Sequence, residues 1–316
     1  MNSPLDMEET WLNRRVNGKY QIIAQLGKGG GGTVFVAQQL SHGDALGEVV
    51  LKFLNASLSS DVAACRRFII EAQAARQVQS PYVMKVFDAD TDEHNRPFIV
   101  MEYLEGQQLA KWTGGEPLPP SRVFPLAIQL AQALAACHRV GVLHRDLSAR
   151  NVLVLDDELS ATVKIIDFGL ALVDHAMTSE TISGTPRYMP PEQIRGEPLD
   201  AGVDIFALGV LLYECFAGRP PIEATDMRDY LRRNLVELPR PLRAHQPQLP
   251  EALDGLLACM MAKERGERPA DMRDVLTRLL SVGRANGWIV GAVENPAVAA
   301  ASTITCAVTK GDVLEA

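Results

Sequence analysis

The first chemistry that this sequence suggests is phosphate binding at a cluster of glycines in residues 26–34. Gly27, Gly29 and Gly32 form a GxGxxG pattern, and glycine lets backbone amides approach a phosphate because no Cβ stands in the way. An ordinary flexible hairpin also accounts for the pattern. In dinucleotide-binding folds such a loop opens a helix, whereas here the β-prone segment 33–37 follows it. We therefore predict a glycine-rich hairpin over a nucleotide.

A lysine lies inside the strand-like run 49–54, which is apolar on both faces. This residue is Lys52, and we expect an anionic partner for it because burying an unpaired ammonium group costs several kcal/mol. Glu71, in the segment that follows, is the candidate partner. Taken singly, a strand lysine is more often solvated and a helix glutamate is more often a surface residue.

The first hundred residues have the pattern of a small sheet with one helix. Strand-like apolar runs occur at 20–24, 33–38, 49–54, 83–88 and 98–103. A helix is expected over 62–77, because this stretch is rich in alanine and the pair Ser80-Pro81 ends it. We therefore predict a small antiparallel sheet carrying a single helix.

From Pro119 onward the sequence changes to helical periodicity. Residues 125–140 place apolar side chains on one helical face, and residues 203–216 are apolar nearly all round, which is typical of a buried central helix. These patterns indicate the α+β class, with a β-rich lobe and a larger, mainly helical lobe. The predicted divisions are an N-terminal extension at 1–15, a domain at 16–282 with lobes 16–103 and 104–282, and a linker or disordered tail at 283–316.

Composition narrows the class of protein further. The 316 residues are 47% apolar and 22% charged, which is enough to bury a sizeable core in one large domain or two lobes. A net charge of -8 without a basic block disfavours nucleic acid as a partner. Five scattered cysteines without a CxxC pair fit a reducing compartment. We expect no secretory signal, no membrane span and a cytoplasmic location, and the oligomeric state is left open.

Two runs in the second half of the chain carry a specific resemblance. Residues 142–154 read VLHRDLSARNVLV and residues 163–171 read VKIIDFGLA. They resemble the HRDLxxxN catalytic loop and the DFG segment of eukaryotic-like protein kinases, of the bacterial serine/threonine type. Residues 184–192 resemble the GTxxYMAPE stretch of the same family. The resemblance covers about residues 20–280.

Three further residues resemble structural positions of that family. Asp204 resembles the aspartate at the start of a buried helix that braces the catalytic loop, although a helix N-terminal residue is the plainer interpretation. Arg268 and Glu192 resemble a structural ion pair.

The resemblance implies a bilobal kinase fold and an ATP- and Mg²⁺-dependent phosphotransferase that acts on a protein substrate. Asp146 would accept or orient the proton of the attacking hydroxyl, and Lys52, held by Glu71, would grip the α- and β-phosphates. Asn151 and Asp167 would supply hard oxygen ligands for Mg²⁺, with Mn²⁺ as an alternative metal. The positions matched to nucleotide binding are Leu26, Gly27, Gly29, Gly32, Val34, Val50, Lys52, Met101, Glu102, Leu104 and Leu153.

Two positions of the catalytic loop leave the choice of hydroxyl open. Ser148 stands where serine/threonine kinases carry lysine, and Arg150 resembles an arrangement seen in tyrosine kinases. We expect Arg150 to replace the missing lysine by neutralising the transferring phosphoryl group. Gly184-Thr185 and the segment 190–193 favour serine/threonine, with tyrosine or dual specificity as the alternative.

Two other classes of function also remain as alternatives. A pseudokinase or scaffold would bind partners without transferring phosphate, and a small-molecule kinase would not be expected to carry the segment 184–192. The enzyme interpretation leads because every group that the resemblance assigns to phosphate transfer is present, namely Lys52, Glu71, Asp146, Asn151 and Asp167.

The segment 170–183 predicts a form of regulation. Its hydroxyl residues are Thr178, Ser179, Thr181 and Ser183. Arg145, directly before Asp146, is expected to leave an unpaired positive charge unless an anion docks beside it. We therefore predict autophosphorylation at Thr181 or Ser179, with a plain solvated loop as the alternative.

Overall fold

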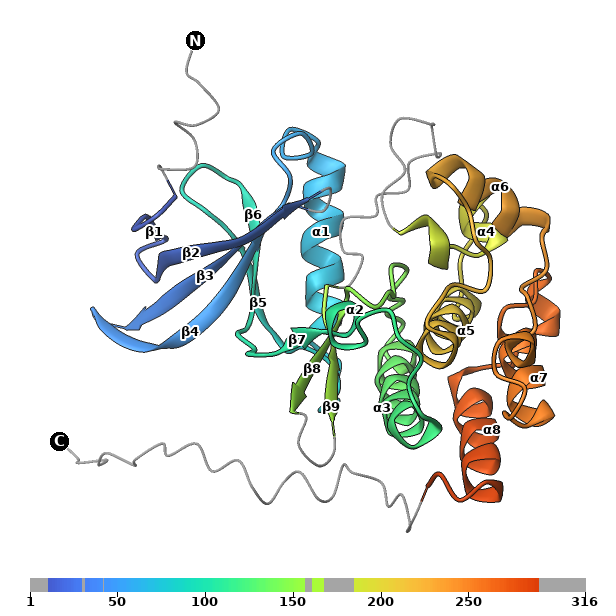
Figure 1. The fold of residues 1–316 in the computed structure, drawn as a ribbon. Coiled ribbons are helices and arrows are strands. Elements are labelled where there is room, and N and C mark those ends of the chain that lie inside the picture. Colours follow the sequence, from blue (N-terminus) through green and yellow to red (C-terminus); the bar gives the residue numbers. More distant parts are fainter. Residues whose placement is uncertain (1–10, 30–31, 42, 157–160, 168–184, 290–316) are drawn as a thin grey trace.

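The computed structural model describes residues 11–29, 32–41, 43–156, 161–167 and 185–289. Within these ranges the chain forms two lobes, one built on a twisted sheet with a single helix and one built mainly of helices (Figure 1). The predicted α+β class and the predicted order of the two lobes are confirmed.

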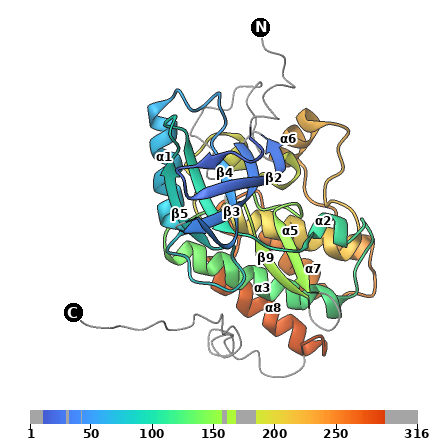
Figure 2. The same ribbon diagram turned by 90° about the vertical axis from the view of Figure 1, so that its left-hand side faces the viewer.

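The N-terminal lobe is built on a six-stranded antiparallel sheet with the order β1-β2-β3-β4-β6-β5. Its strands are β1 Arg15–Val16, β2 Tyr20–Gly29, β3 Gly32–Ser41, β4 Asp44–Phe53, β5 Val86–Thr91 and β6 Pro97–Glu102. Figure 2 shows strands β2 to β5 of this sheet, with a helix beside β5. The strand predicted at 83–88 begins at Val86, because Val83 forms a separate bridge to Ile165 of the other lobe.

One helix, α1 (Val62–Ala75), packs on the sheet against β5 and β6. Asp61 begins it by accepting the backbone N–H of Ala63 at 2.8 Å, which satisfies a donor that the first turn leaves free. Phe68 and Ala72 are buried on its inner face. The predicted helix is confirmed, and it carries Glu71 toward the second lobe.

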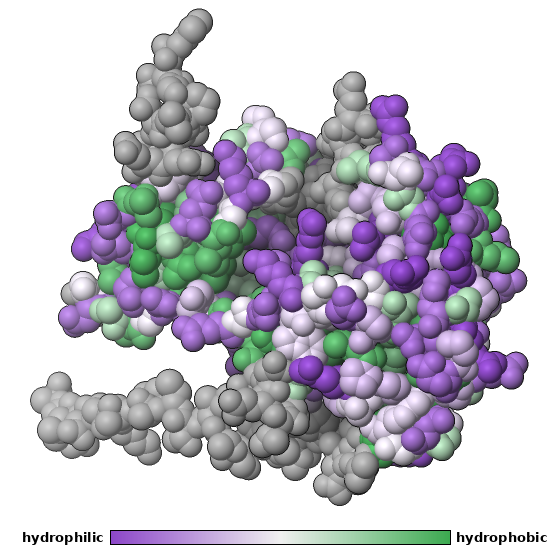
Figure 3. Space-filling view, viewed as in Figure 1, coloured by the Kyte–Doolittle hydropathy of each residue, from purple (hydrophilic) through white to green (hydrophobic). Residues whose placement is uncertain are grey.

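The opposite face of the sheet has its own aromatic core. Phe35, Phe53 and Phe98 alternate in sequence with the residues that face α1, so they gather on the outer side. Trp11 stacks on Phe35 with ring centroids 4.7 Å apart. Apolar residues are also conspicuous on the exterior of this lobe, where Leu26 and other strand residues are exposed (Figure 3).

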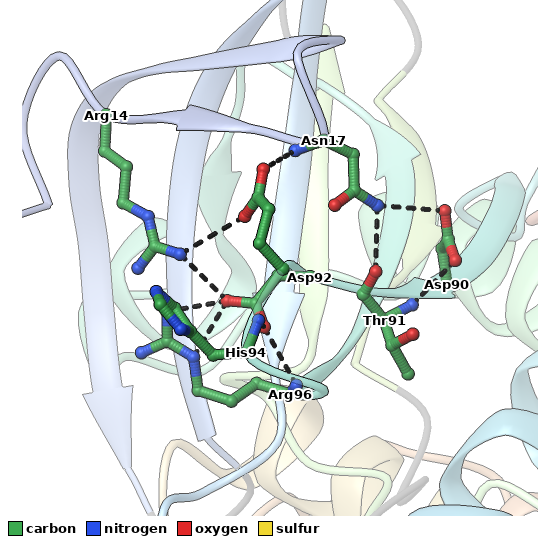
Figure 4. Close-up of polar contacts among 8 residues, drawn as sticks. Arg14, Asn17, Asp90, Thr91, Asp92, His94 and Arg96 are labelled. Carbon is green, nitrogen blue, oxygen red and sulfur yellow. Dashed lines mark hydrogen bonds and ion pairs between the residues drawn. The ribbon is translucent and has the colours of Figure 1, made fainter.

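A buried carboxylate fixes the segment that carries Trp11 (Figure 4). Asp92 accepts from Arg14 Nη2 at 3.1 Å, from Arg96 Nε at 2.8 Å and from the backbone N–H of His94 at 2.9 Å. Burial alone would raise the pKa of Asp92, but the hydrogen bonds from Arg96 hold it below its ordinary value. Trp11 and Arg14, which fall within the predicted N-terminal extension at 1–15, therefore pack on the lobe.

The second lobe surrounds one central helix. Its elements are β7 Gln107–Gln108, α2 Leu109–Trp112, α3 Pro120–Arg139, β8 Val152–Asp156, β9 Thr162–Ile165, α4 Pro191–Ile194, α5 Gly202–Ala217, α6 Met227–Val236, α7 Glu251–Met260 and α8 Met272–Ala285. All residues from Val203 to Tyr213 in α5 are buried, as the apolar pattern predicts. Among the described residues, no helix is long and apolar enough to cross a membrane.

The linker or disordered tail predicted at 283–316 overlaps the end of helix α8. Helix α8 continues to Ala285, so Gly283 lies inside it, and a Cβ at Gly283 would be 2.3 Å from Ile289 and 2.9 Å from Phe124. The helix ends at Ala285 and is followed by Gly287, whose φ is +69°, and the Trp288 N–H donates to the Gly283 carbonyl at 2.9 Å. The glycine that suggested flexibility is a site of close packing.

Candidate active site

The glycine pattern forms the hairpin between β2 and β3, as predicted, with Gly29 paired to Gly32. Gly32 has a φ of +136°, and a Cβ there would be 1.9 Å from the Phe53 carbonyl oxygen, so only glycine fits. A Cβ on Gly27 or Gly29 would meet nothing within 4 Å. Leu26, at the start of the pattern, is 55% exposed and therefore accessible to a ligand.

The side chain of Lys52 is buried on β4, and it pairs with the Asp167 carboxylate. The expected anionic partner therefore exists, but it is not the predicted one. Among the ion pairs of the described residues, Glu71 contacts Arg145 instead, with Oε1 3.1 Å from Nη1. The prediction that Glu71 holds Lys52 was wrong for this conformation, because each charge meets a different neighbour.

The same contact bears on a second expectation. Arg145 was expected to leave an unpaired positive charge unless an anion docks beside it, and the Glu71 carboxylate is an anion bonded to its guanidinium. Its Nε atom remains buried and has no hydrogen-bond partner within the described part of the chain. The proposed phosphorylation sites Thr181 and Ser179 lie outside the described residues.

The loop that carries Asp146 is held from below by α5. Asp204, fully buried, accepts the backbone N–H groups of His144 and Arg145 at 2.9 Å each and contacts His138 Nε2 at 2.7 Å. Arg145 adopts a φ of 64°, which is costly for a residue with a Cβ, and the two bonds to Asp204 stabilise this conformation. The bracing role suggested for Asp204 is confirmed.

The Asp146 carboxylate is oriented by two donors. Asn151 Nδ2 donates to Oδ2 at 3.0 Å and to the Asp146 carbonyl at 2.8 Å, and the Thr185 backbone N–H donates to Oδ1 at 3.2 Å. Burial raises the pKa of Asp146, and the nearby Asp167 carboxylate adds to the rise. Asp146 is therefore fixed in direction and is a stronger base than an ordinary aspartate.

Asp167 and Asn151 lie on adjoining segments, since the Ile166 N–H donates to the Asn151 carbonyl at 2.9 Å. The Asn151 amide nitrogen is occupied by Asp146, so its side-chain oxygen is the atom left for a ligand. Asp167 has a φ of 57°, and its side chain is 44% exposed. One carboxylate and one amide oxygen are a donor set that fits Mg²⁺ bound together with substrate phosphates.

The residues matched to adenine come from both lobes. In the sheet register Val34 lies opposite Lys52, and Val50 lies opposite Met101. Val50 and Met101 are buried, whereas Val34, Leu104 and Leu153 are half-buried and can contact a ligand.

Glu102 has a role that the sequence did not reveal. Its carboxylate accepts from Lys164 Nζ at 2.5 Å and from the Lys85 backbone N–H at 2.7 Å, so it ties β6 to β9. Its own backbone N–H donates to the Lys85 carbonyl at 3.0 Å. Of its two backbone groups, the carbonyl is thus the one that could meet an adenine edge.

Arg150 and Ser148 follow Asp146 but differ sharply in burial. Arg150 is exposed and makes no hydrogen bond or ion pair within the described residues, so the structure leaves its predicted catalytic role untested. Ser148 is 1% exposed, and its hydroxyl has no hydrogen-bond partner among the described residues. Both side chains line a hollow that extends away from Asp146 toward α6.

Several residues that shape this hollow were missed in the sequence. Glu214 of α5 accepts from the Tyr188 hydroxyl and from Arg187 Nη1, the latter at 2.9 Å. Asn234 of α6 is buried and donates to the carbonyls of Pro186 and Met189 at 2.9 and 3.1 Å. A glutamate in the apolar run 203–216 was the available signal, because a buried charge requires partners.

The pair predicted between Arg268 and Glu192 is confirmed. Arg268 donates to both carboxylate oxygens of Glu192, at 2.6 and 2.9 Å, and both side chains are buried. A bidentate pair of this kind fixes α4, and with it the segment after Thr185, against the segment that precedes α8.

Comparisons with known proteins agree with this geometry. The model of the family described as protein kinase domain matches residues 20–280. The chain is 35% identical over 295 residues to serine/threonine-protein kinase pkn3 of Myxococcus xanthus, covering 90% of this chain and 53% of that protein. It is 33% identical to probable serine/threonine-protein kinase PknB of Bifidobacterium longum, covering 88% and 41%.

A crystal structure of the Mycobacterium tuberculosis PknI kinase domain has a similar fold. The TM-score is 0.68 at 25% sequence identity, covering 87% of this chain and 98% of that one. The chain spans about half the length of pkn3 and about a third of the length of M. xanthus pkn2.

Proposed function

The chain belongs to the protein kinase domain family, and on that premise we propose that it transfers the γ-phosphate of ATP to serine or threonine hydroxyls of proteins. The observation that carries the proposal is the Asp146 carboxylate, which Asn151 and the Thr185 N–H hold beside the Lys52–Asp167 pair. Phosphoryl transfer requires positioning and charge neutralisation rather than covalent chemistry by the protein. These groups supply the positioning and the charge neutralisation.

The chemical roles follow from the atoms. Asp146, with its raised pKa, accepts or orients the proton of the attacking hydroxyl. Lys52 offers a buried ammonium group to the α- and β-phosphates, and the glycine hairpin places backbone amides above them. Asp167 and the Asn151 oxygen would hold Mg²⁺, which neutralises phosphate charge when bound.

Serine/threonine specificity is supported by the relatives, which are named serine/threonine-protein kinases. The structure adds that the Thr185 backbone, rather than a bulky side chain, contacts Asp146. Ser148 and Arg150 still resemble an arrangement of tyrosine kinases, so the test must identify the phosphorylated hydroxyl directly.

Incubation with labelled ATP, Mg²⁺ and a generic protein substrate, followed by phosphoamino-acid analysis, tests the proposal. We expect phosphoserine and phosphothreonine, and no label above background with Asp167→Ala. Phosphotyrosine alone would overturn the specificity. Equal incorporation by wild type and Asp167→Ala would overturn the metal role of Asp167, and no incorporation by wild type would favour a pseudokinase.

We further propose that autophosphorylation at Thr181 or Ser179 regulates the enzyme. The support is the present pairing of Arg145. Its guanidinium is bonded to Glu71, and its buried Nε lacks a partner among the described residues. A phosphate, with a charge of about -1.5 to -2, would compete with Glu71 for Arg145. Glu71 would then be available to Lys52, as the family resemblance implies.

Mass spectrometry after incubation with ATP should find phosphate on Thr181 or Ser179. Preincubation with ATP should raise the initial rate of wild type but not of the double variant Thr181→Ala/Ser179→Ala. A fully active enzyme with an unmodified 170–183 segment would show that Arg145 needs no phosphate.

A further inference from the structure

We propose that the hollow beside Asp146 selects protein substrates with an acidic side chain close to the phosphorylated hydroxyl, and that Arg150 is the specificity-determining residue. The proposal deepens the proposed function and rests on it. It names the chemistry of the substrate that the site prefers.

The hollow is a substantial feature of the second lobe, with a volume of about 570 Å³. Ser148 and Thr185 line it at the end next to Asp146, and Met227 and Tyr230 of α6 line it on the opposite side. Because Thr185 donates its backbone N–H to Asp146, a chain that presents a hydroxyl to Asp146 must run past this hollow. The residues flanking the hydroxyl are therefore the ones that it can bind.

Ser148 indicates that the hollow is built to hold a polar ligand. Its hydroxyl is buried without a hydrogen-bond partner in the described part of the chain, although it lines the hollow. An unsatisfied buried hydroxyl is costly, and a ligand that bonds to it recovers that cost. A carboxylate oxygen, which accepts from an O–H donor, suits this position.

The acidic side chains that line the hollow already have hydrogen-bond partners. Glu214 is bonded to Arg187 and to the Tyr188 hydroxyl, and burial raises its pKa. Asp226 accepts the Asp229 N–H at 2.9 Å as the cap of α6. A basic substrate side chain would therefore find no carboxylate free of such bonds among the described lining residues.

Two basic side chains that line the hollow, Arg150 and Arg219, are held more weakly or not at all among the described residues. Arg150 is exposed and unpaired among the described residues. Arg219 lies 3.6 Å from Glu223 in an exposed pair, which holds it only weakly because water screens such contacts. Because the buried charges of the hollow already have partners, the hollow presents guanidinium groups to a ligand. Guanidinium binds carboxylate through paired hydrogen bonds.

Steady-state kinetics with synthetic peptides test the inference. Each peptide carries one serine among glutamine residues, with glutamate or lysine at one flanking position at a time. For wild type, we expect kcat/KM for the best glutamate peptide to exceed that for the all-glutamine peptide by about tenfold. Arg150→Gln should bring this ratio close to one, and Arg150→Glu should move the preference to lysine at the same position.

The matched control is Arg139→Gln, which removes an exposed arginine away from the hollow and should keep the ratio. Equal kcat/KM for the glutamate, glutamine and lysine peptides would overturn the inference while the proposed function stands. The inference also fails if Arg150→Gln lowers kcat for every peptide by one factor and keeps the ratio, because Arg150 would then act on the phosphoryl group. If wild type modifies neither peptides nor proteins, the proposed function and this inference fall together.

Discussion

At the scale of single residues, Asp146 connects structure and reactivity most directly. Its carboxylate is partly buried, and two donors fix its direction. Burial raises its pKa, which brings the pKa closer to working pH and makes the group a better acceptor for a hydroxyl proton. The same shift predicts how activity depends on pH.

We expect kcat/KM to fall as the pH drops through the raised pKa of Asp146, because the protonated carboxyl cannot accept a proton. Activity is present above this pKa and lost below it, so the acid limb should lie above the range of an ordinary aspartate, near 3.8. A pH profile, corrected for the titration of ATP, measures it. The residual rate of Asp146→Asn should lack this limb, and an acid limb near 3.8 in wild type would contradict the account.

Lys263 predicts an effect on stability. Burial, with a contribution from the Arg268 charge, lowers the pKa of Lys263 to about 8 from 10.5. Its ammonium group lies 5.4 Å from the centre of the Phe206 ring and has no hydrogen-bond partner in the described residues. Because the unfolded chain holds this proton up to a higher pH, unfolding free energy should rise with pH between about 8 and 10.5.

Lys263→Met should therefore raise the unfolding free energy near neutral pH by about 1 kcal/mol and flatten the rise above pH 8. Urea denaturation near pH 7 and pH 9 checks both effects. Lys111→Met, at an exposed position, is the control and should change neither. A less stable Lys263→Met at neutral pH would show that the lysine stem contributes more packing than the charge costs.

Residue types could be identified from the sequence better than residue partners. Lys52 in an apolar strand required an anion, and one is present, but the sequence could not choose between Glu71 and Asp167. The choice depends on where α1 lies relative to Arg145, which is a long-range property. The bonds of Glu214 to Arg187 and Tyr188 could not be predicted for the same reason.

At the scale of elements, periodicity located the helices well but misjudged their ends. Apolar residues on every side predicted a buried α5, and Gly283 was taken for the start of a linker. Glycine permits flexibility, but it also permits close packing, and only the structure shows Ile289 and Phe124 against it. The Asn286-Gly287-Trp288 sequence carried the true helix stop.

This distinction predicts opposite results for two glycines inside helices. Gly283→Ala should lower the unfolding free energy by about 1 to 3 kcal/mol, because the added methyl group would overlap Ile289 and Phe124. Gly255→Ala in α7, where a Cβ meets nothing within 4 Å, should raise it by up to about 1 kcal/mol. Thermal or urea denaturation measures the change in unfolding free energy of both variants. A stabilised Gly283→Ala would support the linker interpretation instead.

At the scale of the whole molecule, the two-lobed plan could be predicted from the change to helical periodicity from Pro119 onward. The outer boundaries could not, because they depend on single aromatic residues. Trp11 completes the outer core of the sheet, and Trp288 packs on Phe124 at the other end, with ring centroids 5.0 Å apart. An isolated tryptophan carries no periodic signal, so both segments read as termini.

The site takes its residues from both lobes. Lys52 comes from the sheet, Asp167 follows β9, and Asp146 stands on a loop braced by Asp204 of the central helix. Each lobe alone therefore holds only part of the phosphate-transfer groups. Removing a charge from either lobe should stop the reaction while both lobes stay folded.

The most direct measurement is single-turnover phosphate transfer by wild type, Lys52→Met and Asp146→Asn, each first shown to be folded by circular dichroism and denaturation. We expect both variants to fall by at least about a hundredfold, since each removes a group that acts on phosphate or hydroxyl rather than on packing. Wild-type rates from folded Asp146→Asn would contradict its role as the group that receives the hydroxyl proton.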